Sequence, residues 1–82
     1  MKQIQNKAFG DEILQGLAHK GDELIYLRKC AFYYKALGMS EQEMLDNLEL
    51  LRKEVDSEEE EDLILVLMDQ VGGWCHSDLR IF

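Results

Sequence analysis

The chain contains 82 residues, of which 17 are acidic and nine are basic, and its formal net charge is −8. A chain of this length forms one domain with a modest core, which excludes a separate catalytic domain and a large enclosed cavity. Proline is absent and β-branched residues are few, which favours helices over strands. We therefore predict an all-α fold, in which residues 1–82 form a single compact bundle of about four helices with a short C-terminal tail.

Two helices are predicted in the first half of the chain. The first runs from Lys2 to His19, and Asp11 offers a possible cap for a second piece inside it. The second follows Asp22 and runs over Glu23–Leu37, where Gly38 ends it as a left-handed cap. These helices alternate apolar and polar residues at helical spacing, which predicts one buried face for each.

Two further helices are predicted in the second half, each with a serine cap. Ser40 and Glu43 form the pattern of a capping box, and the helix that follows extends to about Val55. Ser57 is followed three residues later by another glutamate, and the last helix ends at Gly72-Gly73.

The spacing of the aromatic residues predicts which of them are buried. We expect Tyr34, Phe32 and Trp74 in the core, whereas Tyr26 and Tyr33 are expected to be half-exposed with solvated hydroxyls. The tail over residues 74–82 is predicted to be a short extended segment that folds back on the core.

Negative charge is concentrated in one segment. Residues 41–62 carry eleven carboxylates against only Arg52 and Lys53, a net charge of −9, whereas residues 1–40 carry six cations against four carboxylates, a net charge of +2. Crowded like charges destabilise a compact state, and a basic partner would relieve that repulsion. A solvated helix start that merely uses the helix dipole is the simpler interpretation of the run Glu58–Glu61.

The acidic segment predicts a partner-binding surface for a basic protein. Its carboxylates would speed encounter, and one or two apolar or aromatic anchors would slow dissociation. The predicted partner-binding residues are Asp46, Glu49, Leu50, Glu54, Asp56, Glu58, Glu59, Glu61, Asp62, Val66, Asp69 and Tyr33.

Several other site classes find no support in the sequence. Cys30 and Cys75 are expected to be free thiols of a reducing compartment, and the cysteines and histidines lack zinc spacing. No calcium loop, phosphate loop or nucleophile motif is visible, so we expect no metal, no cofactor and no enzymatic activity. The segment before Glu41 mimics a helix-turn-helix turn, but its acidic second helix would repel phosphates, so no direct nucleic-acid binding is expected.

The longest apolar run, Leu63–Met68, is far too short for a membrane span, and the first 20 residues lack the apolar core of a signal peptide. We therefore expect a soluble cytoplasmic protein that does not bind membranes.

In size, acidity and helix count the chain resembles small bacterial immunity proteins, of the colicin-nuclease and contact-dependent growth inhibition types. It has a Tyr33-Tyr34 pair, but without the proline that follows such a pair in the colicin group. The resemblance implies a tight complex with one cognate basic nuclease toxin, whose active site or substrate groove is covered. Two alternatives stay open: a nucleic-acid mimic that inhibits a phage or host DNA-binding protein, such as an anti-restriction or anti-CRISPR factor, and a plain helical module that dimerises through Ile25 and Phe32.

Overall fold

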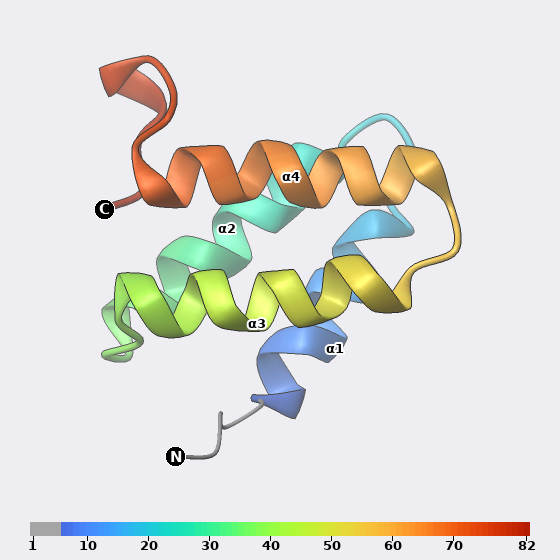
Figure 1. Cartoon of the computed structure of the whole chain (residues 1–82), viewed down its shortest axis with the longest axis horizontal. Helices are drawn as coiled ribbons and strands as arrows, with labels where there is room; N and C mark the ends of the chain where they lie inside the picture. The colour runs from blue at the N-terminus through green and yellow to red at the C-terminus, as the bar shows by residue number, and fades with distance from the viewer. Residues whose placement is uncertain (1–5) are drawn as a thin grey trace.

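A computed structural model describes residues 6–82, which form four α-helices and one turn of 3-10 helix (Figure 1). No strand occurs within these residues, so the predicted all-α fold with four helices and a short tail is confirmed. The predicted start of the first helix at Lys2 lies outside the described residues. The elements in chain order are α1 (Lys7–Leu17), α2 (Glu23–Ala36), α3 (Glu41–Glu54), α4 (Glu58–Gly72) and η1 (Ser77–Leu79).

The helices form two antiparallel hairpins that lie in two layers. Helix α1 packs mainly against α2, and α3 packs mainly against α4. In Figure 1 the α3–α4 hairpin lies in front, while α1 and α2 cross behind it. Smaller contacts of α2 with α4 and of α1 with α3 close the core between the layers.

The core is filled from all four helices and from the tail. Its fully buried large side chains are Phe9, Ile13, Leu17, Leu27, Met44, Leu48, Ile64, Leu67, Val71 and Ile81. Two polar side chains, Asn47 and Gln70, are also buried. The Asn47 amide accepts a 2.8 Å bond from the backbone N–H of Asn6 and donates a 2.8 Å bond to the carbonyl of Glu43. It thereby ties α3 to the residue that caps α1.

The predicted serine caps are present. Ser40 Oγ accepts from the N–H of Glu43 at 3.1 Å, and the Glu43 carboxylate accepts from the N–H of Ser40 at 3.2 Å, which completes the capping box. Ser57 Oγ accepts from the N–H of Glu60 at 3.4 Å. These contacts are local in sequence, which is why residue identity and spacing alone predict them.

The expected internal break in the first helix is absent. Asn6 caps α1 by accepting from the N–H of Phe9, and the helix runs unbroken through Gly10 and Asp11. Gly10 is buried against the Leu51 side chain, where an added Cβ would lie 3.4 Å from a Leu51 methyl carbon. Gly10 therefore lies within α1, in contact with α3, and does not end the helix.

The start and end of α2 differ in how well they match expectation. Gly38 has a φ of +108°, so the predicted left-handed cap is present. Asp22 occupies the cap position at the other end, but its side chain makes no capping hydrogen bond. Phe32 was expected in the core and is instead 42% exposed, because it lines an open hollow on the surface of α2 together with Ile25 and Arg28.

The tail folds back on the core through Ile81 and Phe82, as predicted, but residues 77–79 form a 3-10 turn and Leu79 is 43% exposed. Ile81 is buried, and its N–H donates to the carbonyl of Gln70 at 3.0 Å. Arg28 and Lys35 of α2 donate to the carbonyls of Leu79 and Ile81 at 2.8 and 2.7 Å. The expectation for Trp74 was wrong: it is 84% exposed, because the left-handed Gly73 redirects the chain as it leaves α4.

None of the helices described within residues 6–82 has the length and apolar character needed to cross a bilayer.

Candidate functional site

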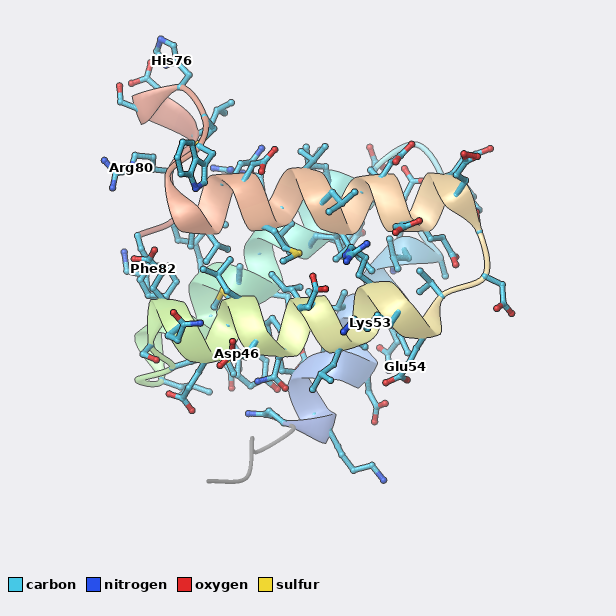
Figure 2. All side chains as sticks on the ribbon, viewed as in Figure 1. Asp46, Lys53, Glu54, His76, Arg80 and Phe82 are labelled. Atoms are coloured by element: carbon cyan, nitrogen blue, oxygen red, sulfur yellow. The ribbon has the colours of Figure 1, made fainter. Side chains whose placement is uncertain are left out.

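Exposed carboxylates gather where α3 gives way to α4. Figure 1 places the connection between these helices at one end of the molecule, and Figure 2 places Glu54 beside it. We call the exposed carboxylates of this end the acidic end: Glu54, Asp56, Glu58, Glu59 and Asp62. None of the ion pairs found within residues 6–82 involves any of them. The first turn of α4 tolerates this density because the helix N-terminus favours negative charge.

Two of the predicted carboxylates are neutralised within the chain. Arg52 binds Glu49 through two of its nitrogens, at 3.0 and 2.7 Å, and reaches across to Glu61 of α4 at 2.7 Å. Lys53 lies 3.9 Å from the same Glu49 carboxylate. These contacts join α3 to α4 and remove Glu49 and Glu61 from the charge available to a partner.

The Arg52 contact changes the pKa of both groups. Its hydrogen bonds hold the pKa of the Glu49 carboxyl below the usual value of 4.5, and the two carboxylates raise the pKa of the guanidinium. A carboxyl whose pKa is lowered on folding stabilises the folded state above its unfolded pKa, and that stabilisation is lost as the pH falls through the folded pKa.

We expect the stability difference between the wild type and Arg52→Gln to depend on pH. The difference should be largest near neutral pH and should shrink as the pH falls from about 4.5 through the lowered pKa of folded Glu49, because protonation of Glu49 removes its charge from the contact with Arg52. Urea unfolding over a pH series measures it. Lys53→Gln is the matched control, since the Lys53 side chain is 67% exposed and its contact is long. A pH-independent difference would contradict this role of Arg52.

The remaining predicted residues do not gather at the acidic end. Asp46 accepts a 2.9 Å bond from Gln42 and lies toward the other end of α3 (Figure 2). Asp69 is exposed near the end of α4, and Leu50 is half-buried. Tyr33 is 56% exposed on α2, in the other layer of the bundle. A single partner surface therefore does not hold the whole predicted set.

A shallow groove, which we call the acidic groove, borders the acidic end. It has a volume of about 340 Å³ and is lined by Glu23 of α2 and by Glu59, Asp62, Leu63 and Val66 of α4. Val66 is 40% exposed there, so three carboxylates surround an accessible apolar strip. Glu23 was missed by the sequence analysis, because only the packing of α2 on α4 brings it here.

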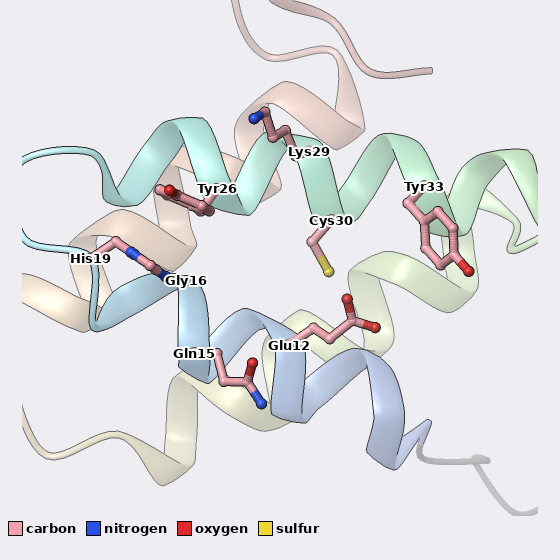
Figure 3. Close-up of a pocket in the computed structure, with 8 residues that line it drawn as sticks. All are labelled: Glu12, Gln15, Gly16, His19, Tyr26, Lys29, Cys30 and Tyr33. Atoms are coloured by element: carbon pink, nitrogen blue, oxygen red, sulfur yellow. The ribbon is translucent and has the colours of Figure 1, made fainter.

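A second hollow lies between α1 and α2 and was not predicted. This α1/α2 cleft has a volume of about 470 Å³ and is drawn in Figure 3. Its lining residues are Glu12, Gln15, Gly16, His19, Tyr26, Lys29, Cys30 and Tyr33. The rings of His19 and Tyr26 stack with centroids 3.8 Å apart. The spacing of Glu12 on its helix could have suggested exposure, but not its position opposite two tyrosines.

The exposed Glu12 carboxylate contacts two buried side chains of α2 at this cleft, Tyr34 and Cys30. The hydroxyl of Tyr34 donates to the Glu12 carboxylate at 2.6 Å, and this bond raises the pKa of Tyr34 to about 12. Burial, together with the nearby Glu12 charge, raises the pKa of the Cys30 thiol to about 12. Cys30 is therefore a thiol rather than a thiolate at neutral pH and is a poor nucleophile.

Both cysteines are free in the structure, Cys30 buried and Cys75 half-buried. Within residues 6–82, no group of three histidine, cysteine or carboxylate side chains is placed to hold a metal ion.

Comparison of the chain with protein-family models, with curated proteins and with solved structures found no match.

Proposed function

We propose that this chain is an immunity-type inhibitor that binds a basic nuclease toxin and covers its substrate groove. One observation supports this most directly. Five exposed carboxylates lie at one end of the bundle, and the ion pairs of the described residues leave all of them available. Such a charged patch suits a cationic protein surface better than it suits any small neutral ligand.

The proposed mechanism is occlusion of the groove. A nuclease binds phosphates through lysine and arginine side chains, and the carboxylates of the acidic end would occupy those positions. The acidic groove beside them adds the apolar strip of Leu63 and Val66, which would be dehydrated on binding. Charge would then set the speed of encounter, and the apolar strip would slow dissociation. No catalytic group on this chain takes part.

Protection of cells is the direct test of this function. The reading frame next to this gene is expressed as a separate toxin, with and without the chain, in the cytoplasm of a bacterial host. We expect nuclease killing without the chain, survival with it, and a one-to-one complex on gel filtration. Survival without any complex, or killing regardless of the chain, would contradict the proposal. A complex with a DNA-binding protein that is not a nuclease would instead identify a nucleic-acid mimic.

One observation favours a second function, dimerisation through α2. Ile25 and Phe32 are 55% and 42% exposed on the uncovered side of that helix. Sedimentation over a range of protein concentrations distinguishes the two functions, because an inhibitor without its partner stays monomeric. Arg28 and Lys29 lie between Ile25 and Phe32 along α2. In an antiparallel pair of α2 helices these cations would lie near their own copies, and like charges across an interface disfavour the dimer.

A further inference from the structure

We infer that the α1/α2 cleft receives an arginine side chain of the basic partner, with Glu12 as its carboxylate. This inference rests on the proposed function, because it assigns a second contact to the same cationic partner. The cleft volume of about 470 Å³ falls in the range of roughly 300–1,000 Å³ that is typical of ligand clefts.

The charge inside the cleft selects a cation. Glu12 is the one carboxylate among its lining residues, and it extends from α1 toward α2 beside Cys30 and Tyr33 (Figure 3). No ion pair within residues 6–82 includes Glu12. Its only side-chain partner given by the described contacts is the Tyr34 hydroxyl, which donates to one oxygen and leaves the other to accept from a ligand.

Lys29 also lines the cleft but does not neutralise Glu12. Its ammonium lies 5.6 Å from the centroid of the Tyr26 ring, within the range of a cation–π contact. Figure 3 shows this side chain on the far side of α2 from Glu12. The interior of the cleft therefore keeps the charge of its carboxylate.

An aromatic wall of the cleft favours arginine over lysine. Tyr26 and Tyr33 are 40% and 56% exposed and line the same cleft as the carboxylate. The Tyr26 ring is already stacked on His19 and lies beneath the Lys29 ammonium. Tyr33 is therefore the ring that a guanidinium beside Glu12 would stack on. A guanidinium is planar, stacks on aromatic faces and binds a carboxylate through several donors, whereas an ammonium is a compact, strongly hydrated point charge.

The position of the cleft allows one partner to reach both sites. Glu23 lines the acidic groove on the α4 side of α2, and Tyr26 lines the cleft on the α1 side. Three residues of an α-helix span only about 4.5 Å along its axis. A partner that crosses the first turn of α2 would therefore contact the groove and the cleft together.

The test uses small probes and the whole chain, so it does not depend on the toxin. N-acetyl-arginine amide is titrated into labelled protein, and amide chemical shifts are followed by NMR. N-acetyl-citrulline amide, which has the same shape without the charge, is the matched probe. We expect saturable shifts confined to α1 and α2 around the cleft, with citrulline amide binding about tenfold more weakly because charged hydrogen bonds are lost.

Variants assign the binding to named groups. Glu12→Gln is expected to abolish the preference for arginine, while its amide oxygen can still accept from Tyr34. Tyr33→Leu should weaken binding severalfold through loss of stacking. Glu41→Gln, an exposed carboxylate at the start of α3, is the matched control and should change nothing.

The outcomes separate this inference from the proposed function. Arginine shifts confined to the acidic end, or equal binding of the two probes, would overturn the inference even if the chain still protects cells from the toxin. Arginine binding in the cleft without protection would support the cleft and overturn the function. Where both hold, Glu12→Gln should speed dissociation of the toxin about tenfold.

Discussion

Replacing Glu58, Glu59 and Asp62 by their amides is expected to slow association with the nuclease partner by about ten- to a hundredfold at low ionic strength. These three side chains are exposed and take no part in an ion pair within residues 6–82, so their field reaches solvent. Added salt should narrow the difference between the wild type and the variant, because it screens exposed charges. Stopped-flow mixing over a salt series measures both effects.

A second triple variant separates local from global charge. Asp11, Glu41 and Asp78 are also exposed, but they lie on α1, at the start of α3 and in η1. Converting these three to amides changes the net charge by the same amount and should leave association nearly unchanged. Equal slowing by both triples would mean that only total charge matters. No slowing by either would remove the acidic end from the mechanism.

The stability of the first variant must be checked, because two effects oppose one another. Glu58 and Glu59 lie in the first turn of α4, where each contributes about 0.3–1 kcal/mol through the helix dipole. Removing three neighbouring negative charges also relieves repulsion among the carboxylates that remain. Thermal unfolding establishes whether the variant is folded at the temperature of the kinetic measurement.

The helices were predictable because their signals are local. The capping box of Ser40 and Glu43 involves residues three apart in the chain, and the left-handed Gly38 acts at its own position. Phe32 was misplaced because α2 carries apolar residues around most of its circumference. Spacing along such a helix does not say which side its neighbours cover, and only packing against α1 and α4 decides it.

The candidate site was predictable only in part, for a related reason. Local composition shows that residues 41–62 are acidic, but it does not show that Arg52 forms ion pairs with Glu49 and Glu61. Glu12 and Glu23 belong to the first 40 residues, whose net charge is slightly positive, so composition did not predict them as site residues. Their positions at the cleft and the groove arise from the packing of α2 on α1 and α4.

The rotation of α4 about its axis connects the fold to this site, since it decides which carboxylates face solvent. Leu67 is fully buried and Leu65, two positions away, is 38% exposed. Leu67→Ala is expected to lower the free energy of unfolding by about 2–5 kcal/mol through loss of burial and creation of a cavity. The free energy of unfolding of a domain is only about 0.05–0.15 kcal/mol per residue, so this loss is a large share of the total stability.

Leu65→Ala is the matched control on the same helix and should cost less than about 1 kcal/mol, since surface substitutions rarely cost more. Urea unfolding of both variants gives the comparison. Equal losses of unfolding free energy in the two variants would mean that α4 does not bury Leu67 in preference to Leu65. Glu59, Asp62 and Val66 would then leave the groove they share with Glu23, and the proposed partner surface would fail together with the packing that creates it.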